Sequence, residues 1–287
     1  MKKKIKAWID PTNFGDLRRG VDNTVKLIEI EVDVPEEEAK DLIHSCLYNW
    51  LGYGNPNGSI WFVGVEEGGA EIWRWGTQTL YSSLQIRSRF KKAMDFRSVW
   101  EDEYGIPLEA FVKRRGSMTT WHYIAGFLLS FNNQPVNTDT VRDFVFHSKQ
   151  LGRLDGDHFL CELLPLPRKN KASIEGYEAV WESVKDYYAE VIPNRFEMIK
   201  DTLVNSTGVR LIMSYNKEFT KLIQKHFPCR LLDEWEIGRG RSYSIVEMEL
   251  IGERKILYLS TPFFGQGQIS YESLNEAVNR LKRWIVE

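Results

Sequence analysis

Two adjacent glutamates, Glu66 and Glu67, follow a short apolar run and are flanked by glycines. The run at residues 60–63 has the length and composition of a buried parallel strand. Flanking glycines allow tight backbone turns and the close approach of a ligand. Because open α/β sheets bind ligands outside the carboxyl ends of their strands, the position of Glu66 predicts a catalytic carboxylate. The alternative is an exposed acidic turn, since most glutamates lie at the protein surface.

Two later apolar runs also end at segments with polar or glycine-rich character. Residues 158–164 contain Glu162 and run into Pro165, and residues 255–260 run into a loop that begins with Thr261. Both runs are bounded by turn-forming residues, as strands are. Three strand ends therefore stand out together, although the sequence leaves open whether Glu66 and Glu162 share one pocket.

The elements around these strands alternate between helical and extended patterns. Helical spacing is expected after Pro35, after Ser173, around Phe196, around Phe219 and after Ser270, and further strands are expected at 209–213 and within 241–251. Residues 77–150 are interpreted as a helical insertion or an elaborated crossover. Alternation of this kind predicts one α/β domain over residues 1–287, with three α/β/α layers and a central, mainly parallel four-stranded sheet.

Composition limits the class of protein. The chain has 287 residues, of which 43% are hydrophobic, and a net charge of −2, so we expect a globular protein with a full core. The three cysteines form no C-x-x-C pair, which argues against a zinc site or an iron–sulfur cluster. No run approaches the ~20 apolar residues of a membrane span, and no signal peptide is recognised. We expect a soluble, cytoplasmic protein that binds no membrane.

The three strand-end segments resemble the motifs of the uracil-DNA glycosylase superfamily. They are GVEEG at 64–68, CELLPLP at 161–167 and STPFFGQG at 260–267. In that family the first strand carries the group that positions water, the second ends in a residue that reads the flipped base, and the last ends in a loop that enters the minor groove. The resemblance implies a three-layer fold and a monofunctional DNA glycosylase that uses no metal and no cofactor.

Two departures from the family pattern bear on activity. Glu67 stands where many members have proline, and Thr261 stands where the family often has histidine. Loss of that histidine removes the usual stabiliser of the leaving base's oxyanion. Backbone N–H groups or Thr261 would have to take that role, or activity is low or absent.

The resemblance implies a role for each carboxyl group. Glu66 would orient water and stabilise the oxocarbenium-like transition state, a contribution typically of about 3 to 4 kcal/mol. Glu162 matches the position where uracil-directed members carry a base-reading asparagine. A carboxylate can accept the N4 amino hydrogens of cytosine but finds only another acceptor at uracil O4, so a cytosine-type base is indicated. The alternative is that Glu162 faces outward or neutralises Arg168.

Gly68 stands where some uracil enzymes place an aromatic ring against C5 of the base. A glycine there leaves space, which would suit a C5-enlarged cytosine such as the hydroxymethylated or glucosylated cytosine of phage genomes. That substrate would imply a role in defence against phage. The alternative is that Gly68 only satisfies a backbone turn.

The remaining candidate residues would hold DNA. Phe263 and Phe264 could form a wedge or a stacking platform for a flipped base, although adjacent strand residues point in opposite directions and one ring is expected in the core. Side chains expected to contact the DNA backbone are Arg168, Lys169, Lys171, Arg239 and Arg241, with Gln266, Gln268 and Ser270 as further phosphate-binding groups.

We therefore expect a monomeric DNA glycosylase that removes a modified pyrimidine and leaves an abasic site. A uracil- or mismatch-directed glycosylase is the nearest alternative. A catalytically inactive nucleic-acid-binding relative is the second, and an α/β enzyme acting on a free nucleoside or sugar is the third. Steep salt dependence of DNA binding would argue against the last of these.

Overall fold

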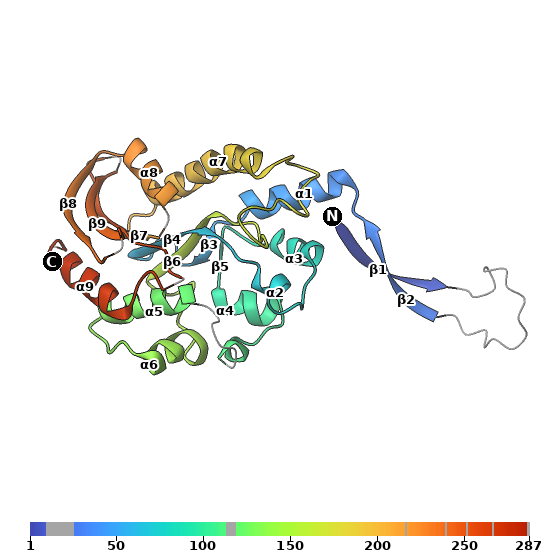
Figure 1. Ribbon diagram of the computed structural model, residues 1–287, viewed down its shortest axis with the longest axis horizontal. Coiled ribbons are helices and arrows are strands. Elements are labelled where there is room, and N and C mark those ends of the chain that lie inside the picture. Colours follow the sequence, from blue (N-terminus) through green and yellow to red (C-terminus); the bar gives the residue numbers. More distant parts are fainter. Residues whose placement is uncertain are drawn as a thin grey trace, which may run out of the picture.

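The computed structural model describes residues 1–9, 26–112, 119–215, 217–238, 240–250, 252–265 and 267–285. Its centre is four parallel strands in the order β6 (His158–Leu164), β4 (Ile60–Glu66), β7 (Leu211–Ser214) and β10 (Lys255–Ser260) (Figure 1). Their carboxyl ends therefore lie at one edge of the sheet. The bounds of β6 and β10 are those expected from their apolar runs.

The sheet has eight strands, so the expectation of four was wrong. On one side β3 (Gly52–Gly54) pairs antiparallel with β6, and β5 (Ala93–Met94) pairs with β3. On the other side β9 (Ser242–Glu249) pairs antiparallel with β10, and β8 (Cys229–Glu236) pairs with β9. Two of the added strands, β3 and β5, are too short to give a periodic signal, and most residues of β8 are exposed or partly exposed.

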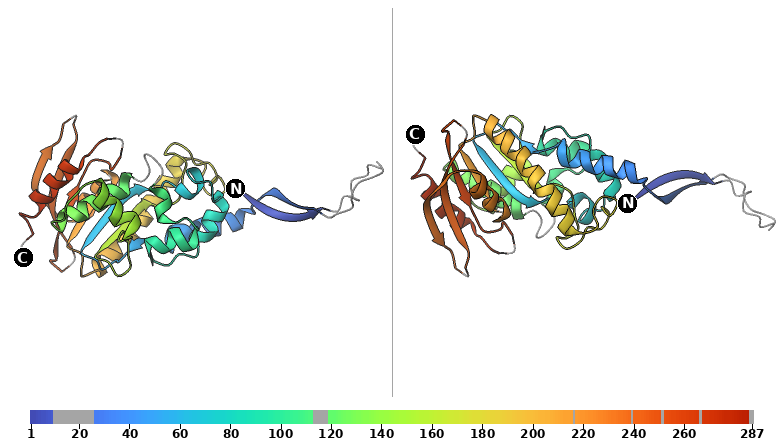
Figure 2. Two further views of the ribbon diagram at one scale, coloured as in Figure 1. Left: turned by 90° about the horizontal axis from the view of Figure 1, so that it is seen from below. Right: turned by 90° about the horizontal axis from the view of Figure 1, so that it is seen from above.

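A separate antiparallel hairpin precedes the main sheet. It consists of β1 (Lys2–Ile9) and β2 (Lys26–Asp33), which pair in register from Lys2 with Asp33 to Ile9 with Lys26. The hairpin projects from the end of the molecule that carries the N-terminus (Figures 1 and 2). The hairpin was not expected from the sequence, although Ile28, Ile30 and Val32 alternate with acidic residues, a pattern typical of a strand with one apolar face.

Helices cover both faces of the sheet. One face carries α1 (Glu36–Tyr48), α7 (Val184–Asn205) and α8 (Lys217–His226), and the other carries α5 (Thr119–Phe131) and α9 (Tyr271–Leu281) (Figure 2). Shorter helical elements are α2 (Ala70–Trp73), α3 (Leu80–Arg87), α4 (Phe96–Ser98), η2 (Val99–Glu103), η3 (Leu108–Phe111), α6 (Thr138–Arg142) and η4 (Asp143–His147). This mixed α/β architecture is compatible with three α/β/α layers.

Helix caps show where local chemistry determined the boundaries. Ser270 caps α9 as expected, and its side-chain oxygen accepts a hydrogen bond from the backbone N–H of Ser273. Ser173 was expected to cap a helix, but its hydroxyl oxygen accepts from the N–H of Glu175 in a turn. The next helix, α7, begins instead after Ser183. Both serines satisfy a backbone donor, and the following residues decide whether a helix continues.

One buried arginine ties α7 to the sheet. Arg195 is fully buried and donates to the carbonyl oxygens of Leu47, Trp50 and Leu51, which follow or end α1, at 2.6 to 3.2 Å. It also donates to the backbone carbonyl of Glu162 in β6, at 3.1 Å. Burial lowers the pKa of this guanidinium to about 10, which leaves it charged at neutral pH.

Among the described residues, every helix is too short or too polar to cross a membrane.

Candidate functional site

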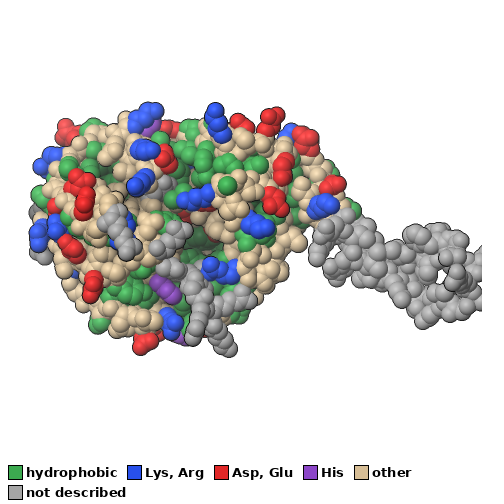
Figure 3. All heavy atoms as spheres, in the orientation of Figure 1, with side chains coloured by type: hydrophobic (Ala, Val, Ile, Leu, Met, Phe, Trp, Pro, Cys, Tyr) green, Lys and Arg blue, Asp and Glu red, His purple; other side chains and the backbone are tan. Residues whose placement is uncertain are grey.

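A cavity of about 590 Å³ opens at the carboxyl ends of the central strands. It is lined by residues from each central strand or the loop after it, and by helices of the 77–150 segment. The main lining residues are Glu66, Glu67, Gly68, Glu162, Tyr215, Phe263 and Phe264 from the strand side, and Phe96, Trp100, Thr120, Trp121 and Ile124 from the helical side. Figure 3 shows a hollow near the middle of one face, with Lys and Arg side chains around it. Volumes of this size are typical of small-molecule sites.

Glu162 projects into this cavity from within β6. Its register partner in β4 is Gly64, where an added Cβ would lie 2.0 Å from Glu162 Oε2. The hydroxyl of Tyr215 donates to Glu162 Oε1 at 3.3 Å, while Oε2 is buried and has no hydrogen-bond partner within the part of the chain described. The carboxyl therefore neither faces outward nor pairs with Arg168. Gly64 is required here because a side chain would occupy the place of the carboxyl.

The environment of Glu162 favours its neutral form. Burial is the main cause that raises its pKa to about 8, and the nearby carboxylates of Glu67 and Glu66 raise it further. The hydrogen bond from Tyr215 and the charge of Arg195 act in the opposite direction but are weaker than the burial effect. At neutral pH the Glu162 carboxyl is therefore mostly protonated.

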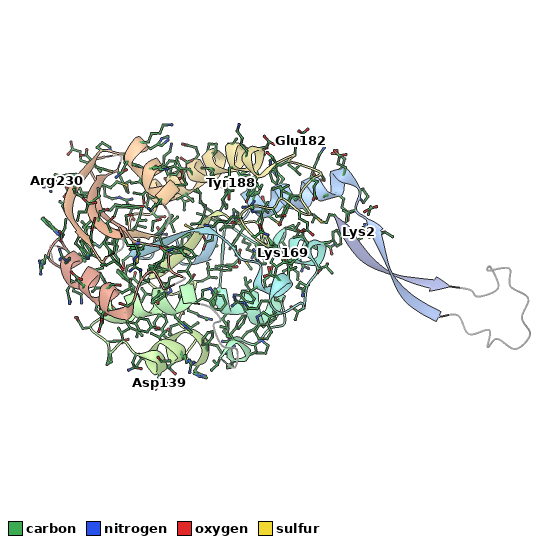
Figure 4. The ribbon with its side chains drawn as sticks, in the orientation of Figure 1. Lys2, Asp139, Lys169, Glu182, Tyr188 and Arg230 are labelled. Carbon is green, nitrogen blue, oxygen red and sulfur yellow. The ribbon has the colours of Figure 1, made fainter. Side chains whose placement is uncertain are left out.

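Glu66 lines the cavity and forms an ion pair with Arg168. The guanidinium of Arg168 also donates to the Ser173 carbonyl at 3.1 Å and to the Tyr188 hydroxyl at 2.9 Å, and it lies over the ring of Tyr187. Arg168 is only 4% exposed. Because these donors are used inside the protein, the arrangement does not support the predicted contact of Arg168 with DNA phosphates. Tyr188 is labelled in Figure 4.

The second acid of the pair, Glu67, belongs to a hydrogen-bonded network that was not expected from the sequence. Tyr53 donates to Glu67 Oε1 at 2.9 Å, and Arg87 donates to Glu67 Oε2 at 2.5 Å. Arg87 also donates to Glu71 Oε1 at 3.0 Å, and Ser83 donates to the same oxygen at 2.6 Å. Arg87 and Glu71 are almost fully buried, so one guanidinium compensates two carboxylates. Ser83 and Arg87 share a helix face at i, i+4 spacing, which is the signal that the sequence offered.

Thr261 does not point into the cavity. Its N–H donates to the Ser214 carbonyl at 2.9 Å, which continues the pairing of β10 with β7 by one residue, and its buried hydroxyl donates to the Pro262 carbonyl at 2.9 Å. It is not part of the cavity lining. The arrangement therefore does not support the predicted catalytic role of Thr261, since its hydroxyl is turned toward the backbone.

The two phenylalanines of the last loop have different environments. Phe264 is fully buried and stacks on Tyr215, with ring centroids 4.6 Å apart and an interplanar angle of 17°. Phe263 is half-buried and also lines the cavity. This confirms the expectation that one of the two rings is core. Phe263 is the ring placed to contact a ligand, and Phe264 fixes Tyr215.

Gly68 leaves open space at the cavity wall. An added Cβ at this position would meet no heavy atom within 4 Å, and the residue is exposed. The adjacent Gly69 differs, because its φ is +54° and a Cβ there would lie 2.7 Å from Pro167. The turn therefore depends on Gly69, while Gly68 keeps the cavity open.

The remaining residues expected to bind DNA divide into two groups. Lys169 lines the cavity and is exposed, and Lys171 is exposed with its ammonium 5.7 Å from the centre of the Phe263 ring. Lys169 is labelled in Figure 4. Both remain available to a phosphate group.

The residues of the second group contact the protein itself, are partly buried, or lie outside the described residues. Arg241 donates to the carbonyls of Gly267 and Gln268 at 3.0 and 2.6 Å, so it joins the turn before β9 to the loop after β10. Gln268 is partly buried, and Ser270 caps α9. The predictions for Arg239 and Gln266 fall on positions outside the described residues.

Histidine, cysteine and carboxylate side chains do not gather in groups of three that could hold a metal ion, within the residues that the structure describes. Comparison with protein-family models, with curated proteins and with solved structures finds no match to this chain.

Proposed function

We propose that the protein is a DNA glycosylase that cleaves the N-glycosidic bond of a modified pyrimidine and leaves an abasic site. The observation that carries this proposal is the placement of Glu66 and Glu162 in one cavity, at the carboxyl ends of neighbouring parallel strands. The two groups have different environments: Glu66 is paired with Arg168, whereas burial keeps Glu162 mostly protonated. Carboxyl groups in such contrasting environments are typical of acid–base and charge-stabilising sites.

Glu66 would act on the sugar. Cleavage of the glycosidic bond passes through an oxocarbenium-like state, in which positive charge develops on the deoxyribose ring. A carboxylate beneath the ring stabilises that charge and orients the attacking water, and one preorganised group of this kind typically contributes about 3 to 4 kcal/mol. The ion pair with buried Arg168 fixes the Glu66 side chain before substrate binds.

Glu162, Tyr215 and Phe263 would hold the flipped base. Extruding a nucleotide costs a few kcal/mol, which stacking and hydrogen bonds in the pocket offset. The half-buried ring of Phe263 offers a stacking surface, and the exposed Lys169 and Lys171 beside it can neutralise backbone phosphates. The space beside Gly68 favours a pyrimidine enlarged at C5, such as glucosylated hydroxymethylcytosine.

The test uses duplex DNA that contains uracil, a thymine mismatch, hydroxymethylcytosine or glucosylated hydroxymethylcytosine. Abasic sites are detected as alkali-labile strand breaks. The wild-type protein is expected to act on the glucosylated base, and Glu66→Gln is expected to be slower by roughly a hundredfold to a thousandfold. Glu272→Gln, which changes an exposed glutamate on α9, serves as the matched control and should retain the rate. Absence of breaks in every DNA would refute the proposal.

The second candidate is an inactive DNA-binding relative, and the position of Thr261 favours it. Because the hydroxyl of Thr261 is bonded to the backbone, this residue does not replace the histidine of the family motif. Salt-sensitive DNA binding without base release would support this candidate. Cleavage of uracil or mismatched DNA in preference to the glucosylated base would support a uracil- or mismatch-directed enzyme instead.

A further inference from the structure

The Glu162 carboxyl has one uncompensated oxygen in the cavity wall. Oε1 accepts from Tyr215, but Oε2 is buried without a partner among the described residues. A buried polar atom without a hydrogen bond costs free energy, so such atoms mark places where a ligand or water completes the bonding. Because Gly64 has no side chain, the Glu162 carboxyl can pack directly against β4, and this close contact determines the position of Oε2.

The groups that face Glu162 make a charged carboxylate unfavourable. Glu66 and Glu67 at the end of β4 are negative, and Tyr215 after β7 is neutral at physiological pH. The guanidinium of Arg195 in α7 donates to the backbone carbonyl of Glu162, and its charge lowers the pKa of the Glu162 carboxyl by less than burial raises it. Burial and the two like charges together raise the pKa of Glu162 to about 8.

We propose that Glu162 binds the base as a neutral carboxylic acid, which offers an O–H donor beside a C=O acceptor. This inference rests on the proposed function and specifies what the cavity reads. A neutral carboxyl can accept the N4 amino hydrogen of cytosine while it donates to N3, and it can equally accept the N3 hydrogen of uracil while it donates to O4. The cavity therefore accepts any pyrimidine edge that places a donor next to an acceptor.

The bases are then distinguished by the substituent at C5 of the pyrimidine ring. The expectation that Glu162 selects cytosine over uracil assumed an ionised carboxylate, which only accepts hydrogen bonds. With a protonated carboxyl both edges fit, so the open wall at Gly68 and the volume of the cavity become the features that distinguish a large C5 substituent from a small one.

The test measures binding rather than turnover. DNA duplexes carry one 2′-fluorinated nucleotide of deoxyuridine or deoxycytidine, because the fluorine destabilises the oxocarbenium-like state and slows cleavage. Affinity is measured by fluorescence anisotropy at about pH 6 and about pH 9 and is divided by the affinity for a duplex with an abasic-site analogue. With a carboxyl pKa of about 8, the preference for uracil over the abasic analogue is expected to fall roughly tenfold across this range. Cytosine should lose less, because a carboxylate still accepts from N4.

Glu162→Gln is the matched variant, since an amide keeps one donor and one acceptor but does not titrate. Glu162→Gln is expected to bind both bases without this pH dependence. Any change in affinity that this variant still shows at high pH reports the ionisation of uracil itself. A wild-type preference that changes with pH no more than that of Glu162→Gln would overturn the inference, as would the absence of any preference over the abasic analogue. If base binding behaves as expected but unfluorinated DNA is never cleaved, the glycosylase proposal fails while this inference holds.

Discussion

Replacing Gly64 by alanine tests the close approach of β4 to the Glu162 carboxyl. The added Cβ would lie 2.0 Å from Oε2, 2.3 Å from Oε1 and 2.4 Å from Cδ, so the whole carboxyl group has to move. We expect the flexible side chain to yield rather than the strand. Moving it breaks the hydrogen bond from Tyr215, worth about 0.5 to 1.5 kcal/mol, and forces a less favourable rotamer at about 0.5 to 1.5 kcal/mol.

Gly68→Ala is the matched control, because a Cβ there meets nothing within 4 Å. Both substitutions reduce the conformational freedom of the unfolded chain by a similar amount, so this contribution cancels when the two variants are compared. Gly64→Ala is therefore expected to be less stable than Gly68→Ala by about 1 to 3 kcal/mol. The measurement is urea-induced unfolding, followed by tryptophan fluorescence.

A second background isolates the cause. In Glu162→Ala the carboxyl is gone, so adding a methyl group at position 64 should cost no free energy of unfolding relative to the same background. A double-mutant cycle measures this coupling directly. Equal destabilisation by Gly64→Ala in both backgrounds, or none in either, would show that the carboxyl does not occupy the position described.

Three other predictions concern stability and DNA binding. Because the folded-state pKa of Glu162 (about 8) lies above its ordinary value of 4.5, the folded protein should lose stability as pH rises from about 5 to about 8, by up to about 1.4 kcal/mol per pH unit. In Glu162→Gln this part of the pH dependence of urea unfolding should be absent. Arg87→Met leaves the buried carboxylate of Glu71 and the half-buried carboxylate of Glu67 without their cation and should cost about 3 to 5 kcal/mol in the same assay. Lys221→Ala, at an exposed ion pair, should not change stability measurably. Replacing Lys169 and Lys171 together by alanine should weaken binding to every DNA sequence and reduce the slope of log affinity against log salt concentration by about 2; an unchanged slope would show that neither lysine meets a phosphate.

The parallel centre of the sheet could be predicted because its signals are local. The strands at β4, β6 and β10 are continuous apolar runs that end at turn residues, and Ser270 lies three residues before Ser273 in a cap. Strands β3 and β5 could not be found this way, since two or three residues carry no periodicity. Their place at the sheet edge depends on pairing with β6, which is about a hundred residues away from β3.

Side-chain partners in the site were less predictable than the strand ends. Glu66 and Glu162 were identified from their position near strand ends, but the partners of Arg168, Arg87 and Tyr215 were not. Arg168 appears in a basic, proline-rich segment, which suggests an exposed cation, and its burial follows from Glu66, 102 residues earlier. Such pairings depend on how the loops fold over the sheet, and charge patterns along the chain do not report them.

The contacts of Arg195 join the layers of the protein mechanically. Its guanidinium donates to the backbone carbonyl of Glu162 from the α7 side of the sheet, while the Glu162 side chain enters the cavity on the other side. The same guanidinium holds the chain that follows α1. A displacement of α7 would thus shift β6 at the base of the cavity, although α7 itself does not contact the ligand. The helical layer opposite the cavity can in this way change the alignment of the Glu162 carboxyl.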